Sequence, residues 1–337
     1  MKLKRIVYLG YYIKKMNWKL LIKFFSHVKK EHKKGKIATF FDMIFCVFNY
    51  NIAPLEYFQF RFFVKDKQER KKWAGTGYMY EVIYKLNPHK NNYVLNDKIY
   101  FLTHYKKFIK HSFFTLSEIL NDKSLFQNFL SQEPSKIVLK NSKGNCGIGI
   151  EVLEPSALSI EKITQRLIAG GNNMVEEFVT QHCLLNKLSS SGLNTLRIIT
   201  LIDEQQKVQI LGVRLRITVN NVVDNLAAGN IAAEVDQETG IVVGPGVYSD
   251  ITKQDEYYHP FSGIEIVGFE IPYFKEAIKL ASDAALLNTL NKTVGWDIAI
   301  TENGPDIIEG NHDWCKLLWQ LPAKRGLKHM LEPYTYN

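Results

Sequence analysis

Residues 295–311 read Gly295-Trp-Asp-Ile-Ala-Ile-Thr-Glu-Asn-Gly-Pro-Asp-Ile-Ile-Glu-Gly-Asn311. An Asn-Gly pair, Asn303-Gly304, separates two apolar runs, which is a pattern typical of a β-hairpin. With the turn centred on this pair, Asp297 should lie near the level of Glu309. Side chains alternate along a strand, so Glu309 and Asn311 should share one face. The stretch therefore predicts a core hairpin with three oxygen donors at its open end.

These three oxygen donors, Asp297, Glu309 and Asn311, are candidate metal ligands. Oxygen ligands suit one or two Mg²⁺ ions, which often also bind nucleotide phosphates. The alternative is a set of surface acids that flank a turn. Because tryptophan and isoleucine fill most of the other positions, the acids at the base of this hairpin should be partly buried and should need partners.

A glycine-rich segment follows a predicted strand over residues 136–140. It reads Lys140-Asn-Ser-Lys-Gly-Asn-Cys-Gly-Ile-Gly149. Glycines let backbone amides approach an anion closely, and Lys140 and Lys143 supply positive charge. The spacing fits neither the Walker pattern nor the dinucleotide fingerprint, and a strand-like run rather than a helix follows it. We expect a flap between two antiparallel strands that either clamps phosphate or is an ordinary hairpin loop. The glycines of this flap are Gly144, Gly147 and Gly149.

Three arginines, Arg197, Arg214 and Arg216, lie on predicted strands. Arg214 and Arg216 are two residues apart, so their side chains should face one way. The guanidinium fork matches both carboxylate and phosphate groups. These arginines could therefore bind an anionic ligand, or they could pair with structural acids such as Asp224 or Glu234.

The rest of the chain predicts an α+β fold with a helical N-terminal part. Residues 12–36 and 55–72 read as amphipathic, lysine-rich helices. The apolar stripe of the first helix consists of Leu20, Leu21, Phe24, Phe25 and Val28. Further strands are expected at 174–179, 195–202, 208–219, 294–300 and 306–309, and helices at 115–131, 157–169 and 273–290.

The composition is that of a globular protein with one large domain or two to three small ones. The chain has 337 residues, of which 46% are hydrophobic and 23% are charged, which excludes the disordered, collagen-like and fibrous classes. Its four cysteines form no CxxC pair, so we expect reduced thiols and a cytoplasmic location. No signal peptide is evident. Residues 38–48, the most apolar early stretch, cover about half of the roughly 20 residues that a membrane span needs, and predict a buried or interfacial helix.

The net charge of +9 is distributed unevenly. Residues 1–120 carry a net charge of +16 and residues 121–337 a net charge of −7, and the first 36 residues alone hold 12 basic side chains and one acid. Such a block indicates either an anionic partner, such as a phosphate-rich ligand, nucleic acid or a membrane surface, or a solvated helical face.

In their order along the chain, these segments resemble the ATP-grasp superfamily of carboxylate–amine ligases. Asn96-Asp-Lys98 followed by Phe101 resembles the opening motif of that fold. Lys140 and the loop to Gly149 resemble its second phosphate lysine and its flap. Val175-Glu-Glu-Phe-Val179 resembles the hinge strand that hydrogen-bonds adenine.

The hairpin completes the match, because Asp297, Glu309 and Asn311 resemble the magnesium ligands of the superfamily. The resemblance covers about residues 96–320. It implies ATP and Mg²⁺ as cofactors and an α+β ATP-grasp fold, in which two subdomains clamp ATP. We expect a helical basic region at 1–95, a first subdomain with the flap at 96–175, and a second subdomain with the metal site at 176–331.

A narrower resemblance is to the sugar-transfer-associated ATP-grasp family, which is typically associated with bacterial surface-polysaccharide biosynthesis. The sequence differs from the family pattern in two places. Ala227-Ala228 stands where relatives often show a Gly-Gly pair, and the usual ribose-binding acid after the hinge is not evident. The matching segments are Tyr57-Phe-Gln-Phe60, Asn194-Thr-Leu-Arg197, Asp224-Asn225 with Gly229, Ile271-Pro272, Gly295-Trp-Asp297 and Glu309-Gly-Asn311.

The resemblance implies a role for each motif. Lys98 and Lys140 would hold the α- and β-phosphates of ATP, and the flap with Lys143 would cover the β- and γ-phosphates. Arg197 and Arg216 would stabilise an acyl phosphate and its developing oxyanion. The residues implied for the adenosine part are Glu176, Glu177, Phe178, Val179 and His182. Those implied for the substrates are Arg214, Asn225 and Gly229.

The implied function is an ADP-forming, ATP- and Mg²⁺-dependent ligase. It would join an amino acid or amine to a sugar carboxylate or a related glycan precursor through an acyl phosphate. Two alternatives stay open: a phosphotransferase on the same scaffold, and a non-catalytic anion- or membrane-binding protein with a vestigial ATP site. We expect no nucleic-acid partner. The basic N-terminal region is expected to hold an anionic acceptor or to contact the inner membrane peripherally.

Overall fold

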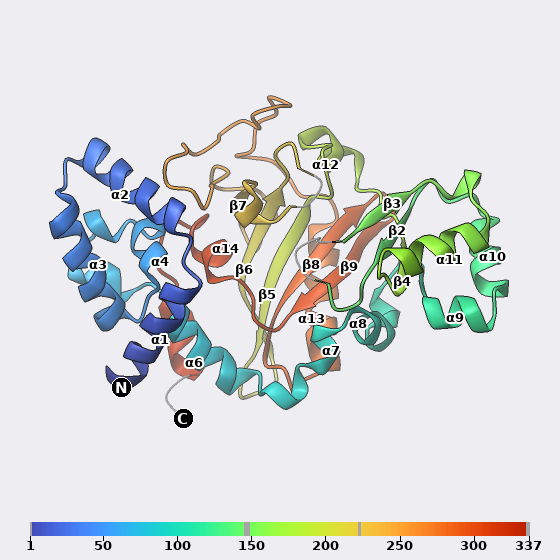
Figure 1. Cartoon of the computed structure of the whole chain (residues 1–337), viewed down its shortest axis with the longest axis horizontal. Helices are drawn as coiled ribbons and strands as arrows, with labels where there is room; N and C mark the ends of the chain where they lie inside the picture. The colour runs from blue at the N-terminus through green and yellow to red at the C-terminus, as the bar shows by residue number, and fades with distance from the viewer. Residues whose placement is uncertain (1, 145–148, 222–223, 335–337) are drawn as a thin grey trace.

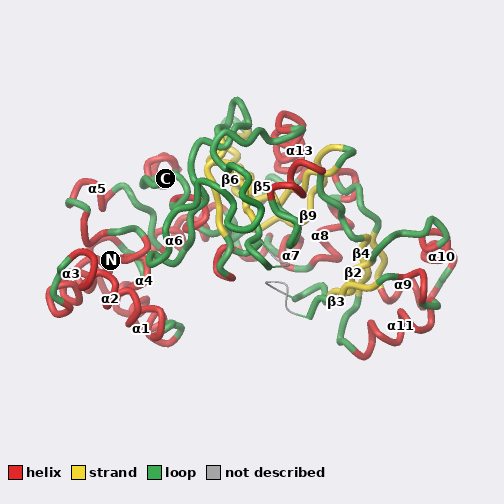
Figure 2. Tube along the Cα trace, turned by 90° about the horizontal axis from the view of Figure 1, so that it is seen from above, coloured by secondary structure: helices red, strands yellow, loops and turns green. Residues whose placement is uncertain are grey.

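The computed structural model describes the whole chain except residues 1, 145–148, 222–223 and 335–337 (Figure 1). Two antiparallel sheets and their helices form an elongated molecule. A helical N-terminal region lies at one end and the smaller sheet lies at the other (Figure 2). The fold is therefore α+β, as the sequence predicts. The helices found in the described part of the chain all lack the length and apolarity needed to cross a bilayer.

The N-terminal region contains more and shorter helices than predicted. The expected helix over 12–36 is divided because Asn17 caps a new helix, its side chain accepting a hydrogen bond from the Leu20 amide at 3.1 Å. The expected helix over 55–72 is likewise divided by a 3₁₀ turn at Phe62–Val64. The helices are α1 (Lys2–Lys14), α2 (Trp18–His32), α3 (Lys36–Tyr50), α4 (Pro54–Gln59) and α5 (Lys67–Lys71).

The predicted stripe of α2 does face the core of this region. Leu21, Phe24 and Val28 are buried there among aromatic residues of α4 and the 3₁₀ turn, and Leu20 and Phe25 pack against them while partly exposed. The same core includes residues from the loops beside the larger sheet. This packing joins the N-terminal helices to the rest of the molecule.

The smaller sheet has the strand order β1-β4-β2-β3. Its alternating side chains separate two faces: Ile137, Leu139 and Val175 pack under the helices, whereas Lys140 and Glu176 belong to the opposite face. β2 and β3 are antiparallel, which confirms the predicted strands on either side of the glycine-rich segment. The strands are β1 (Phe113–Thr115), β2 (Ile137–Lys140), β3 (Glu151–Leu153) and β4 (Met174–Glu177), and the helices are α9 (Leu116–Asn121), α10 (Ser124–Leu130) and α11 (Ile160–Ala169).

The larger sheet has the strand order β7-β6-β5-β8-β9. Helix α13 packs on one face of it, and α6 and α14 pack on the other. The strands are β5 (Thr195–Ile202), β6 (Val208–Ile217), β7 (Ile231–Val235), β8 (Thr293–Thr301) and β9 (Gly304–Asn311). The remaining helices are α6 (Thr76–Leu86), α7 (Tyr93–Asn96), α8 (Lys98–His104), α12 (Cys183–Leu188), α13 (Phe274–Leu287) and α14 (Lys316–Gln320).

The predicted hairpin is formed by β8 and β9, but its turn lies one residue earlier than expected. Thr301 pairs with Gly304, so Glu302 and Asn303 are the two turn residues. Gly304 follows them with a φ of +93°, a conformation that glycine adopts without strain. The Asn-Gly signal therefore identified the hairpin correctly and misplaced its centre.

A β-bulge in β9 restores the predicted level of the acids. Ile298 pairs with Ile307, but the next pair is Asp297 with Glu309, so Ile308 is the extra residue. Ile298 and Ile307 are both core residues beneath α13. Because paired residues share a face, the bulge turns Glu309 away from that core and onto the face of Asp297.

Candidate active site

The centre of the candidate site is a buried carboxylate held by two arginines. Asp297 on β8 accepts two hydrogen bonds from Arg197 on β5, at 2.6 and 2.9 Å, and pairs with Arg216 on β6 at 2.8 Å. The cross-strand register places Arg197 directly opposite Asp297. Burial alone would raise the pKa of Asp297, but the two arginines lower it to about 2. The carboxylate is therefore ionised at any physiological pH.

Gly295 allows this arrangement, because a side chain at its position would occupy the space used by its neighbours. A Cβ at Gly295 would lie 2.7 Å from Cβ of Trp314 and 3.1 Å from Cδ of Arg197. The glycine of the Gly-Trp-Asp segment thus gives the stem of Arg197 room to lie along the sheet.

A second carboxylate, Asp224, extends the cluster. It pairs with Arg216 at 2.6 Å and accepts a hydrogen bond from Thr195. Burial raises the pKa of Asp224, against the effect of Arg216, and the charge of Asp297 adds to the rise. The alternative that an arginine pairs with a structural acid is therefore realised for Arg216, which bridges two carboxylates.

The two other predicted metal ligands lie beside Asp297. Asn311 donates through its amide nitrogen to Asp297 at 3.4 Å and to the Gly295 carbonyl at 3.3 Å. The side chain of Glu309 makes no hydrogen bond or ion pair with any described residue. Its pKa is raised by burial and by the charge of Asp297. Glu309 is half-buried beside a second carboxylate, and a bound cation would offset the cost of this arrangement.

Two lysines from the other side of the site act on the same carboxylate. Lys98 and Lys140 both lower the pKa of Glu309 through their charge, against its overall rise. Lys98 begins α8 and donates to the Gly144 carbonyl at the start of the flap, which holds the helix against the smaller sheet. Its neighbour Asp97 accepts a hydrogen bond from Ser142 at 2.9 Å. The structure therefore brings Lys98, the base of the flap and the acids of the hairpin together.

Lys140 is part of a buried chain of charges that the sequence did not indicate. It pairs with Glu176, whose carboxylate lies 3.8 Å from Nε2 of His111. Nδ1 of His111 in turn lies 2.7 Å from Asp306 on β9. Burial would lower the pKa of His111, but Asp306 outweighs it and keeps this pKa above its ordinary value. One indication of this chain was present in the sequence: Asp306 is an acid inside a core strand, and a buried carboxylate needs a partner.

The hinge after β4 offers free backbone groups. Phe178 still donates its amide to the Lys136 carbonyl at 3.2 Å, and Glu177 accepts from the Ser112 amide at 2.9 Å. The amide and carbonyl of Val179 make no hydrogen bond within the described part of the chain. This is the backbone edge for which the resemblance to ATP-grasp enzymes predicts adenine.

His182 lies just beyond the hinge and caps α12. Its Nδ1 accepts the Leu184 amide at 3.2 Å. Ligand atoms of His182, Cys183 and Glu302 lie within 4.8 Å of one another and could hold a metal ion. However, Glu302 already accepts the Cys183 amide at 2.7 Å, and both Cys183 and Glu302 are exposed, so this group is less well suited than the acids of the hairpin.

The three residues predicted to contact substrate lie in different surroundings. Arg214 is 1% exposed, and its guanidinium donates to the carbonyls of Trp319 and Val213 and lies 3.7 Å from Glu234. Burial lowers its pKa to about 10. These contacts favour a structural role for Arg214 at the end of α14, although it shares a face with Arg216 as predicted.

Asn225 and Gly229 flank a short 3₁₀ turn next to Asp224. Asn225 accepts the Ala227 amide at 3.0 Å, and Gly229 ends the turn with a φ of +92° and open space around it. Both are partly exposed, so a ligand could reach them. Of the flap, Lys143 and Gly149 are exposed, and Gly147 lies outside the described residues.

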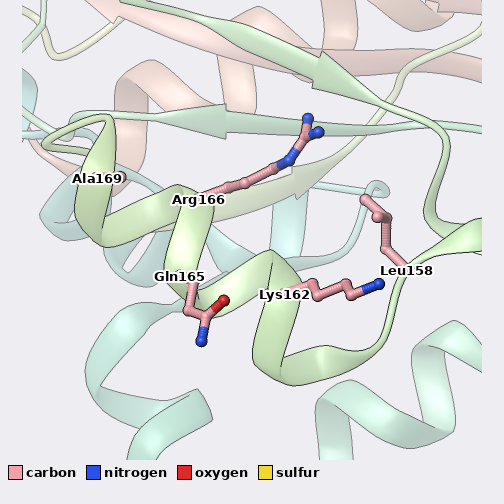
Figure 3. Close-up of a pocket in the computed structure, with 5 residues that line it drawn as sticks. All are labelled: Leu158, Lys162, Gln165, Arg166 and Ala169. Atoms are coloured by element: carbon pink, nitrogen blue, oxygen red, sulfur yellow. The ribbon is translucent and has the colours of Figure 1, made fainter.

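The described surface also carries a groove of about 370 Å³ along α11 (Figure 3). Lys162 and Arg166 extend from this helix in the figure, and Arg166 pairs with Glu151 at 2.8 Å. The groove contains no carboxylate pair or buried cation. Its lining residues are Leu158, Lys162, Gln165, Arg166 and Ala169.

The chain is similar to several known proteins. No curated protein sequence matches the chain. Similar solved structures include the ATP-grasp ligase PsnB complexed with a phosphomimetic variant of its minimal precursor, Mg and ADP (14% identity, TM-score 0.41, covering 74% of this chain and 60% of that chain). Others are D-alanyl-alanine synthetase A from Vibrio cholerae (12%, 0.41, 70% and 60%) and the D-cycloserine synthetase DcsG (12%, 0.42, 74% and 73%). The chain thus spans about three fifths of the first two.

The decisive comparison is with protein families. The sequence pattern described as sugar-transfer associated ATP-grasp matches residues 79–335, about three quarters of the chain. It includes the lysines, the hinge, the arginines and the acid hairpin described above. The chain therefore belongs to the sugar-transfer associated ATP-grasp family.

Proposed function

We propose that the protein is an ADP-forming, ATP- and Mg²⁺-dependent ligase that joins a carboxylate to an amine through an acyl phosphate. The observation that carries the proposal is the position of Glu309. This half-buried carboxylate has no side-chain partner among the described residues, and it lies between Lys98 and Lys140 on one side and the Asp297–arginine cluster on the other. Family membership supports the same reading.

ATP would lie between the two sheets, with its adenine at the hinge and its phosphates at the hairpin. The free backbone edge at Val179 suits the adenine, and Glu177, Phe178 and His182 surround that edge. Lys98, Lys140 and Lys143 would neutralise the phosphates. For Lys140 this requires exchanging part of its pairing with Glu176 for a phosphate oxygen.

The donor set of the hairpin fits Mg²⁺. Oδ1 of Asp297 accepts a single hydrogen bond, from Arg197, the carboxylate of Glu309 is unpaired within the described structure, and Asn311 keeps its amide oxygen. Three hard oxygens with two negative charges match the preference of this ion. When bound, Mg²⁺ supplies charge neutralisation at the phosphate oxygens.

Arg197 and Arg216 would act on the transferred phosphoryl group and on the acyl phosphate. A substrate carboxylate oxygen attacks the γ-phosphorus, and the bond to the β,γ-bridging oxygen breaks to release ADP. The amine then attacks the acyl carbon, the carbon–oxygen bond to phosphate breaks, and the amine loses a proton. Neither step needs a nucleophile from the protein. Both need positive charge held in place, and two buried arginines already fixed by Asp297 and Asp224 provide it without reorganisation.

The substrates proposed are an amino acid or amine and a sugar carboxylate, in surface-polysaccharide biosynthesis. The family description supports the sugar. Asn225 and Gly229 are the proposed substrate contacts, because both are partly exposed next to Asp224. Arg214 would contribute only by stabilising the fold. We also propose a cytoplasmic location with a peripheral contact to the anionic inner leaflet.

The test is product analysis. The protein with ATP, Mg²⁺ and a panel of uronic acids and amines should release ADP and phosphate and form an amide. AMP and pyrophosphate would contradict the acyl phosphate, and a stable phosphorylated product without free phosphate would indicate a phosphotransferase. ATP turnover that survives in Asp297→Asn at the wild-type rate would indicate that this site is not catalytic.

A further inference from the structure

Helix α3 is apolar on both of its sides. Its sequence, Lys36-Ile-Ala-Thr-Phe-Phe-Asp-Met-Ile-Phe-Cys-Val-Phe-Asn-Tyr50, contains one lysine and one acid. One side, with Met43, Cys46 and Val47, is buried in the core of the N-terminal region. A helix that is hydrophobic all round is normally enclosed by protein or by lipid. The opposite side of α3 is exposed.

That opposite side is a continuous stripe of large apolar residues. Ile37, Phe40, Phe41 and Phe45 are 46–76% exposed. Their spacing of three, four and eight residues from Ile37 places them on one face of the helix. Single exposed apolar residues are common on protein surfaces, but a row of four on one helix is not.

Helix α2 extends the stripe. Trp18 is 53% and Ile22 is 61% exposed. Ile22 and Phe25 line a shallow groove of about 330 Å³ together with Lys36, Ile37 and Phe40 of α3. The two helices therefore present one joint surface, which we call the α2–α3 surface. It consists of Trp18, Ile22, Phe25, Ile37, Phe40, Phe41 and Phe45.

Lysines surround this surface, and few acids offset them. Lys19, Lys29, Lys33 and Lys36 are exposed and form no ion pair with any residue that the structure describes. The acid of α3, Asp42, is already engaged by Arg70 through two hydrogen bonds of 2.8 Å and by Tyr57 at 2.7 Å. The positive charge around the surface is therefore available to an external partner.

We propose that the α2–α3 surface docks the protein onto an anionic lipid bilayer. Aromatic and aliphatic side chains would enter the boundary between headgroups and acyl chains, and the lysines would contact lipid phosphates, as amphipathic interfacial helices do. Neither helix is long enough to span a bilayer, so both would lie in its plane. A second copy of the chain fits less well, because two identical lysine-ringed surfaces repel each other.

This inference rests on the membrane contact included in the proposed function, and not on the ligase chemistry. Helices α2 and α3 lie at the end of the molecule opposite to the smaller sheet (Figure 1, Figure 2). Residues of the α2–α3 surface therefore take no part in the candidate active site, and the two properties can be tested separately.

The experiment measures binding of the full chain to phosphatidylcholine vesicles with and without phosphatidylglycerol. We expect binding that requires the anionic lipid and weakens as salt is added. The double variant Phe40→Ser/Phe41→Ser should bind at least about tenfold more weakly than the wild type, because it removes two phenyl groups from the contact. Leu120→Ser/Leu125→Ser is the matched control: it removes two exposed apolar residues from the other end of the molecule and should bind like the wild type.

Trp18 provides a second readout that leaves Phe40 and Phe41 unchanged. The other four tryptophans, at positions 73, 296, 314 and 319, are at most 4% exposed. Brominated phosphatidylglycerol should therefore quench the fluorescence of Trp18 selectively, and Trp18→Phe should abolish that quenching while sedimentation with vesicles persists.

Three results would overturn the inference. These are unchanged vesicle binding by Phe40→Ser/Phe41→Ser, equal binding to neutral vesicles, and self-association in solution that this variant abolishes, which would identify a second copy as the occupant. Vesicle binding by a protein without ATP turnover would leave the docking intact and contradict only the ligase. Conversely, a Phe40→Ser/Phe41→Ser variant that forms product but does not bind vesicles would support both.

Discussion

The positive charges of the α2–α3 surface and those of the candidate active site differ in solvent exposure and in ion pairing. Lys19, Lys29 and Lys33 are exposed and have no ion pair within the described chain, so each contributes weakly and salt screens all of them. Arg197 is buried, Arg216 is mostly buried, and both pair with Asp297, so each is fixed in position and difficult to remove. A solvated charge attracts a distant partner but is screened by salt, whereas a charge fixed by a buried partner is held ready in one position.

The substitution with the largest expected effect is Asp297→Asn, which removes the carboxylate that fixes both arginines. Loss of this carboxylate leaves two buried guanidinium groups with less compensation, so we expect a loss of about 3–5 kcal/mol in the free energy of unfolding. Turnover should fall by about 10²–10³, as for loss of a preorganised charge contact. Urea denaturation and ADP release would measure the two effects, and a variant as stable as the wild type would contradict the structural part.

Glu309→Gln separates metal binding from stability in the same cluster. Glu309 has a raised pKa and no partner within the described residues, so its neutral replacement should lower Mg²⁺-dependent turnover by about 10² or more without lowering stability.

The pH dependence of Glu309→Gln checks the sign of that effect. A carboxylate whose pKa is raised on folding destabilises the protein as pH rises above its unfolded value of 4.5. Without Mg²⁺, Glu309→Gln should therefore unfold at a higher temperature than the wild type at neutral pH, and at the same temperature below pH 4.5. A lower unfolding temperature at neutral pH would mean that Glu309 has a stabilising partner.

His111→Asn tests the buried chain that joins the two sheets. The substitution removes the contact with Asp306, so we expect a loss of about 1–3 kcal/mol in stability. Because the pKa of His111 is raised on folding, its contribution is complete below the unfolded value of 6.5 and is lost as pH rises through the folded value. The difference in unfolding free energy between wild type and variant should therefore shrink at alkaline pH, as guanidinium unfolding at several pH values would show.

The smallest expected effect on the stability of the fold is that of substituting the exposed lysines. Lys29→Ala/Lys33→Ala should change the free energy of unfolding by less than about 0.5 kcal/mol, because both side chains are exposed and unpaired within the described structure. The same variant should weaken binding to phosphatidylglycerol vesicles by about 30-fold, at roughly 1 kcal/mol per lysine. A marked fall in thermal stability would show that these lysines support the fold, and would remove the contrast with the arginines.

Much of the fold was predictable because it depends on local patterns. The strand over 195–202 occurs as predicted, and the buried side of α2 follows from the spacing of Leu21, Phe24 and Val28. Helix ends were less predictable. Asn17 divides a continuous lysine-rich pattern. One long helix and two shorter helices would both satisfy the periodicity, and the capping side chain of Asn17 decides for two.

The candidate site was predictable in part. The level of Asp297 and Glu309 agrees with the structure, but for a different reason: the turn is shifted by one residue, and the bulge at Ile308 compensates. Two partners of the arginines were among the acids named from the sequence, because Arg216 pairs with Asp224 and Arg214 lies near Glu234. The pairing of Arg197 and Arg216 with Asp297 was not foreseen. Arg214 and Arg216 share a face, yet one meets the end of α14 and the other meets two carboxylates.

The sequence by itself determined which residues alternate between core and surface, where the hairpin lies, and which groups carry charge. These properties follow from residues that are neighbours along the chain. Only the tertiary structure decided that His111 lies between Asp306 and Glu176, that Arg197 rather than Arg214 holds Asp297, and that α3 keeps an exposed apolar side. Each of these features depends on whether segments far apart in the sequence contact each other. Packing between such segments, rather than the local sequence pattern, determines which side chains are buried and which charges are paired.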